Sequence, residues 1–103
     1  MTNIGCVFYK KTGQPGELTA KWCHSDDGQG TGIASGGPLE GFEGDYHIRY
    51  FDENENVQAD RELRILKSAG IYKLTWFKDG KVTAEGVGME TSDGLSAGYR
   101  NLA

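Results

Sequence analysis

Two charged side chains, Arg61 and Glu85, fall on the inner face of predicted β-strands. Arg61 has the same parity as the apolar residues of its strand, and a two-residue turn at Asp79-Gly80 places Glu85 opposite Leu74 on the inner side. Burying a charge without a partner is very costly, so the two residues indicate either a mutual salt bridge or a polar cavity for a ligand carboxylate or hydroxyl. A bulge or a slipped register would instead leave at least one of them in solvent.

Tyrosine and tryptophan gather on the same inner parity. Each combines an apolar ring with one polar group, which suits a pocket for a small planar or amphipathic molecule. The alternative is a packed core, because the interior of an eight-stranded barrel is only just wide enough for side chains or for one small ligand. The candidate ligand-binding residues are Trp22, Tyr46, Tyr50, Arg61, Tyr72, Trp76, Glu85 and Tyr99.

Patterns for catalysis or metal binding are weak. Residues 24–26 read His-Ser-Asp, but a catalytic triad needs side chains that converge in space. Cys23 and His24 point to opposite faces of a strand, so no metal site is expected. No cofactor is expected either, because Gly30-x-Gly32 lacks the third glycine and the helix of a phosphate-binding loop. We therefore predict a noncatalytic protein, with a small barrel enzyme that uses the inner charged pair and a tyrosine as the alternative.

Alternating apolar and polar residues, interrupted by Gly, Pro, Asp and Asn, predict an all-β chain. Residues 59–66 have a competing pattern that suits a short helical turn. Eight antiparallel strands with short connections close into an up-and-down barrel, which removes exposed edges, and 103 residues fit a single domain, 1–103. The expected strands are 4–11, 18–25, 29–35, 41–51, 57–67, 71–78, 81–90 and 95–101.

The first hairpin fixes a register. A four-residue loop, GQPG, pairs Val7 with Trp22 and Cys6 with Cys23. The tryptophan then faces inward, as Trp76 does in a later hairpin of similar pattern. The two cysteines face outward at a separation that a disulfide requires, and in the cytoplasm we expect them to stay reduced.

Charge and chain ends restrict the partners. A formal net charge of −4, with cations and anions interspersed, excludes the clustered basic surface that binds nucleic acid. The first residues, MTNIGCVFYKK, lack a signal-peptide pattern, and no apolar stretch approaches membrane-spanning length. We therefore expect a cytoplasmic protein with no nucleic-acid or membrane partner.

Four apolar residues have outward parity. If Ile4, Phe8, Ile71 and Phe77 lie near one another, they form a larger patch than a monomer normally exposes. Such a patch predicts a homodimer or another protein partner, with Phe8, Ile71 and Phe77 at the interface. A regulatory, protein-binding module is therefore the second candidate function.

The run of Trp22, a glycine-rich strand, Gly44-Asp45-Tyr46 and then Trp76 resembles the barrels of the avidins and lipocalins, the calycin superfamily. It is also similar to compact bacterial lipocalin-like proteins, some of which bind another protein. The resemblance implies an eight-stranded barrel in which Tyr46 and Trp76 line a ligand cavity. The segment after Trp22, CHSDDGQG, does not contain the Asn and Ser pattern of avidins, so biotin is not implied as the ligand.

Overall fold

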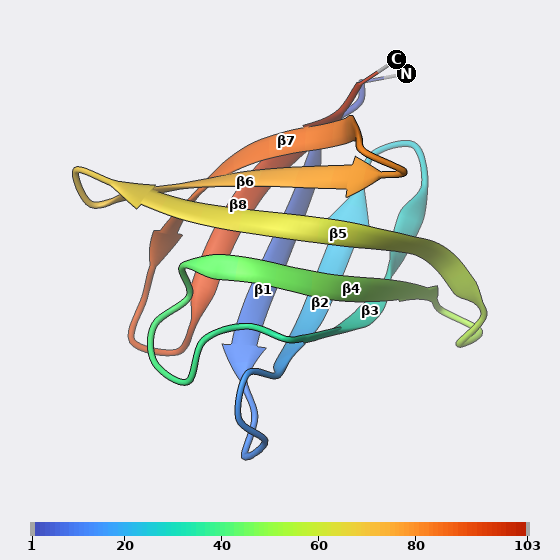
Figure 1. Cartoon of the computed structure of the whole chain (residues 1–103). Coiled ribbons are helices and arrows are strands. Elements are labelled where there is room, and N and C mark those ends of the chain that lie inside the picture. Colours follow the sequence, from blue (N-terminus) through green and yellow to red (C-terminus); the bar gives the residue numbers. More distant parts are fainter. Residues whose placement is uncertain (1, 103) are drawn as a thin grey trace.

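The computed structural model describes residues 2–102 and shows an all-β chain closed into an antiparallel barrel (Figure 1). Each strand pairs with its neighbours in sequence, and β1 pairs with β8 to close the barrel, so the expected up-and-down fold is confirmed. The strands are β1 (Gly5–Lys11), β2 (Leu18–His24), β3 (Gly28–Ser35), β4 (Gly44–Asp52), β5 (Val57–Ser68), β6 (Ile71–Lys78), β7 (Lys81–Glu90) and β8 (Leu95–Asn101).

Period-two burial explains why these segments are strands. In β2 every second residue is buried, including Trp22, while the residues between them face solvent. The expected register of the first hairpin is confirmed, with Val7 opposite Trp22. Residues 59–66, where a helical turn competed, lie inside β5, because Leu63 and Ile65 are buried two positions apart on one face.

Two tight turns connect β5 to β6 and β6 to β7. Asp79 and Gly80 form the second turn, with φ values of 52° and 81°. A two-residue hairpin loop of this kind needs positive φ at both positions, which Asp-Gly tolerates at low cost. The prediction of a two-residue hairpin turn at Asp79-Gly80 is therefore confirmed.

A β-bulge follows that turn and changes the faces of β7. The register between β6 and β7 shifts between Trp76 and Phe77, so that Trp76 lies opposite Ala84. The extra residue, Thr83, reverses which positions of β7 face inward. Glu85 therefore pairs with Thr75 on the outer face. The prediction that Glu85 faces inward is therefore wrong.

A second bulge lies between β4 and β5. The pairing passes from Tyr50 opposite Ala59 to Phe51 opposite Val57, and Gln58 is the extra residue. Val57 is consequently 58% exposed, although its parity predicted an inward side chain. Both bulges lie at the same end of the barrel, where they place Gln58 and the β7 residue Thr83 around the opening described below.

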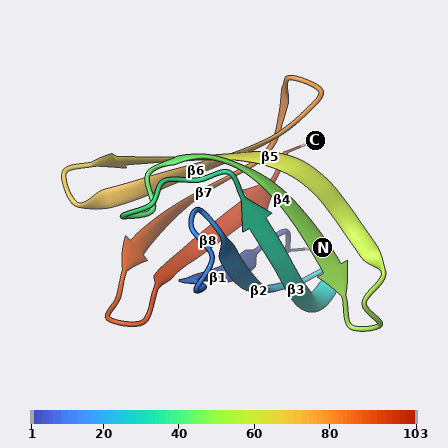
Figure 2. The ribbon, with the colours of Figure 1, turned by 60° about the horizontal axis from the view of Figure 1, so that its bottom comes forward.

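The other end of the barrel is closed. Figure 2, with this end turned forward, shows the segment between β3 and β4 running across it. Phe42 from that segment is buried and packs edge-on against Tyr72 of β6, with ring centroids 6.4 Å apart. The Tyr46 hydroxyl donates to the Phe42 carbonyl oxygen at 2.8 Å, which fixes the segment in place. The packed core therefore occupies this half of the barrel.

Candidate functional site

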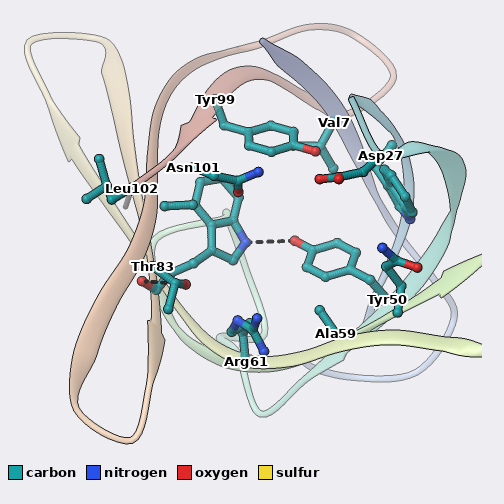
Figure 3. A pocket seen from close by; sticks show the side chains of 13 residues that line it. Val7, Asp27, Tyr50, Ala59, Arg61, Thr83, Tyr99, Asn101 and Leu102 are labelled. Atoms are coloured by element: carbon teal, nitrogen blue, oxygen red, sulfur yellow. Dashed lines mark hydrogen bonds between the residues drawn. The ribbon is translucent and has the colours of Figure 1, made fainter. Parts of the chain in front are cut away.

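A cavity of about 370 Å³ opens at the end of the barrel opposite Phe42, and Figure 3 shows its lining side chains. Its walls come from strands all around the barrel and from the residues that follow β2 and β8. The lining residues are Val7, Trp22, Asp27, Tyr50, Gln58, Ala59, Arg61, Trp76, Thr83, Ala84, Tyr99, Asn101 and Leu102.

Aromatic side chains form much of the wall. The Trp22 indole donates through Nε1 to the carbonyl oxygens of Thr31 and Phe51, each at 3.1 Å, so its ring has a fixed orientation. Trp76 and Tyr99 lie with ring centroids 5.4 Å apart and ring planes tilted by 50°. These held rings give the cavity flat apolar surfaces against which a planar ligand can pack.

Tyr99 owes its position to a small residue on the neighbouring strand. Gly5 pairs with Tyr99 across β1 and β8, and a Cβ atom at Gly5 would overlap the tyrosine ring. His24 lies on another side of the ring, at 5.7 Å between centroids. Burial raises the pKa of Tyr99 to about 12, so its hydroxyl is protonated at neutral pH.

A hydroxyl network lies at the floor of the cavity. The Trp76 indole donates from Nε1 to the Tyr50 hydroxyl oxygen at 2.7 Å (Figure 3). The Tyr50 hydroxyl is also hydrogen-bonded to the hydroxyl of Tyr9, whose side chain is 0% exposed. Burial raises the pKa of both tyrosines well above the ordinary value, so both are neutral.

Arg61 projects into the cavity, as its parity predicted. Its Nη1 donates to the carbonyl oxygen of Asp60 at 2.9 Å, and no carboxylate within residues 2–102 lies within ion-pair distance. Each of the other three arginines has a carboxylate partner on the outer surface. These pairs are Arg49 with Asp60, Arg64 with Asp45, and Arg100 with Glu85.

The expected partner of Arg61 lies elsewhere. Glu85 accepts a hydrogen bond from Nη2 of Arg100 at 2.9 Å on the outer face, and this bond lowers the pKa of the Glu85 carboxyl. The inner charged pair therefore does not form. An enzyme with Arg61 and Glu85 as its acid and base has no support, because the barrel wall separates them.

Two of the predicted ligand-binding tyrosines lie in the packed half of the barrel. Tyr46 is bonded to the Phe42 carbonyl, and the Tyr72 hydroxyl donates to Oε1 of Glu90 at 2.7 Å. Neither tyrosine lines the cavity. The structure brings together five of the eight predicted residues: Trp22, Tyr50, Arg61, Trp76 and Tyr99.

Sequence reasoning missed several polar residues of the rim. Gln58 and Thr83 reach the cavity because they are the extra residues at the two bulges, and parity carries no signal for a bulge. Asp27 comes from the turn after β2, with Oδ2 3.4 Å from Nδ1 of His24. The sequence carries no signal for this residue, because alternation along the strands does not show which end of the barrel is open.

The predicted interface residues do not form one patch. Phe77 lies near the end of β6. The Arg64 guanidinium lies over its ring, with the Arg64 Cζ atom 5.6 Å from the ring centroid. Ile71 begins the same strand and is exposed, while Phe8 lies on β1, which β7 and β8 separate from β6. A shared interface for Phe8, Ile71 and Phe77 is therefore not present on the barrel surface.

The described part of the chain, residues 2–102, contains neither a metal-ligand cluster nor a membrane-spanning helix. Across residues 2–102 no three His, Cys, Asp or Glu side chains are grouped to hold a metal ion. Cys23 is exposed on the outer face, whereas His24 is buried inside. The same residues include no helix long and apolar enough to cross a membrane.

Fold and cavity together define a class: a closed eight-stranded antiparallel barrel with an aromatic cavity at one end, an architecture consistent with a calycin-like fold. No protein-family model matches this chain, and comparisons with curated proteins and with solved structures found no significant match. The shared feature with lipocalins and avidins is the barrel architecture alone.

Proposed function

We propose that this protein is a noncatalytic binding barrel that holds one small amphipathic or aromatic molecule in its open end. The observation that carries the proposal is a cavity inside the barrel whose aromatic wall residues, Trp22 and Trp76, are fixed by hydrogen bonds. Small-molecule sites are concave, mostly apolar and supplied with a few polar groups that orient the ligand. Arg61, Asn101 and Gln58 are such groups here.

The noncatalytic part of the proposal is supported by the kind of polar groups in the cavity. Its tyrosines stay protonated at neutral pH, and Arg61 is a hydrogen-bond donor that does not release its proton. Tyr50 and Arg61 therefore present donors to the cavity, which suits recognition of an acceptor group. A cytoplasmic location stays a prediction.

Intrinsic fluorescence and thermal unfolding test this function directly. A panel of aromatic and amphipathic metabolites should contain compounds that quench Trp22 or Trp76 and raise the melting temperature, because a ligand of the folded state stabilises it. Ala59→Phe should abolish both effects by filling the cavity, whereas Thr19→Phe, with the same ring on the outer face, should preserve them. A panel without effect on either readout would contradict the proposal.

A second function, self-association, is favoured by the outer surface of β5, β6 and β7. Leu66 and Val87 lie on either side of Lys73, and the exposed side chains of Ile71 and Met89 come next along β6 and β7. We define Leu66, Ile71, Val87 and Met89 as the outer apolar face. We propose that a second copy of this chain covers it, since exposed apolar side chains gathered on one face mark protein contacts.

Analytical ultracentrifugation separates this second function from the first. At high concentration the wild type should sediment as a dimer, and Val87→Lys should sediment as a monomer. Val82→Lys is the matched control, because Val82 is exposed near the other end of β7. A wild type that stays monomeric at high concentration would remove the self-association function and leave the ligand cavity unaffected.

A further inference from the structure

The Tyr50 hydroxyl is hydrogen-bonded to two protein groups, the Tyr9 hydroxyl and the Trp76 indole. Tyr9 is fully buried and its hydroxyl is hydrogen-bonded to the Tyr50 hydroxyl, and the bond can run in either direction. We infer that Tyr9 donates, because the opposite direction would leave its buried O–H without an acceptor. The Trp76 indole also donates to Tyr50. The Tyr50 oxygen thus accepts two hydrogen bonds, and its own O–H is left to donate into the cavity.

A second donor faces the same space. Arg61 is the one arginine in residues 2–102 without a carboxylate partner, and its guanidinium lines the same cavity as Tyr50 (Figure 3). Burial raises the pKa of the Tyr50 phenol, and the positive charge of Arg61 acts in the opposite direction and lowers it. A planar cationic fork next to a hydroxyl donor matches the two oxygens of a carboxylate.

We propose that the cavity takes a planar aromatic monocarboxylate, with its carboxylate held by Arg61 and Tyr50 and its ring packed against Trp22, Trp76 and Tyr99. This inference rests on the proposed binding function and names the ligand class. The rings form flat walls, and the cavity volume of about 370 Å³ is at the small end for ligand sites, which are roughly 300–1,000 Å³.

One negative charge is favoured over two. The cavity lining contains a single arginine and no lysine, so a second anionic group finds no cationic partner there. Asp27 lies across the mouth from Arg61 and repels a second anion (Figure 3). A phosphate dianion or a dicarboxylate is therefore a poorer ligand than an acid with one charge.

A pair of probes with the same ring tests the ligand class. At pH 7, 2-naphthoate should bind the wild type about 10-fold or more tightly than the neutral 2-naphthamide, since hydrogen bonds to a charged group are strong. Titration calorimetry and tryptophan quenching measure both constants. Naphthalene-2,6-dicarboxylate should bind more weakly than 2-naphthoate, because its second carboxylate lies near Asp27.

Substitutions test whether Arg61 and Tyr50 cause the preference for 2-naphthoate over 2-naphthamide. Arg61→Gln and Tyr50→Phe should each weaken 2-naphthoate binding more than 2-naphthamide binding, which reduces the ratio between the two probes. Arg49→Gln is the matched control, because Arg49 is an arginine on the outer face, and it should keep the wild-type ratio. The wild-type comparison of the two probes needs no variant, so a folding defect cannot obscure the result.

The possible failures are distinct. Equal binding of 2-naphthoate and 2-naphthamide by the wild type, or an unchanged ratio in a folded Arg61→Gln variant, overturns the ligand class while the binding function stands. If the wild type binds neither probe but is stabilised by an uncharged compound of the wider panel, the ligand class is again overturned and the binding function stands. Failure of the whole panel overturns the binding function together with the ligand class.

Discussion

Two tyrosine-to-phenylalanine changes, each removing one oxygen atom from the same hydrogen-bonded pair, should differ in their cost to stability. Tyr9→Phe removes a donor and leaves Tyr50 still bonded to the Trp76 indole. The loss is that of one ordinary hydrogen bond, about 0.5–1.5 kcal/mol. Because Tyr50 retains its partner, no buried polar group is left without a bond.

Tyr50→Phe removes the acceptor that two buried donors share. The Tyr9 hydroxyl and the Trp76 indole N–H then both lose their partner, and each such loss costs about 1–3 kcal/mol. We therefore expect a decrease in the free energy of unfolding of about 2–6 kcal/mol, clearly larger than for Tyr9→Phe. The asymmetry follows from the assignment of Tyr50 as the acceptor.

Urea unfolding followed by circular dichroism measures the two free energies under identical conditions. Tyr72→Phe serves as the control, because its partner Glu90 is exposed and can bond to water instead, so the cost should stay below about 1 kcal/mol. If Tyr9→Phe costs as much as Tyr50→Phe or more, Tyr50 is not the shared acceptor. The free O–H that we assign to the cavity would then have no basis.

Two further changes test the packing around the site. Gly5→Ala should lower the melting temperature and disturb the cavity wall, because the new methyl group overlaps the Tyr99 ring, whereas Gly13→Ala has open space around it and should change little; differential scanning fluorimetry compares the two. Alkaline pH should destabilise the fold between pH 10 and about 12, because the pKa values of Tyr46 and Tyr99 are raised by burial from 10.0 to about 12 and the folded state holds these protons more tightly than the unfolded chain. Absorbance of tyrosinate, recorded beside circular dichroism, should show ionisation and unfolding together, and free titration of all tyrosines near pH 10 in a folded protein would contradict it.

The sequence predicts the strands well because alternation and turn residues are local signals. The GQPG loop fixes the register of the first hairpin, and Asp79-Gly80 fixes the connection of a later one. Arg61 was placed inside on parity alone, and it does line the cavity. Such signals suffice wherever a strand pairs regularly from end to end.

The remaining differences have two physical causes. A bulge inserts one residue without a sequence mark, which turned Glu85 outward and brought Thr83 to the mouth. Parity also gives the face of a side chain but not its depth along the barrel axis. Tyr46 and Tyr72 face inward as expected, yet they lie in the half that Phe42 closes.

The central claim is that one end of this barrel is an open, aromatic site with unpaired donors at its floor. A crystal structure of the protein grown with 2-naphthoate measures this most directly. We predict density for the ligand in the cavity, with its carboxylate within hydrogen-bond distance of Arg61 and Tyr50 and its ring against Trp76. A bore filled by the protein's own side chains, with Trp22 and Trp76 packed together where the cavity should be, would contradict the account.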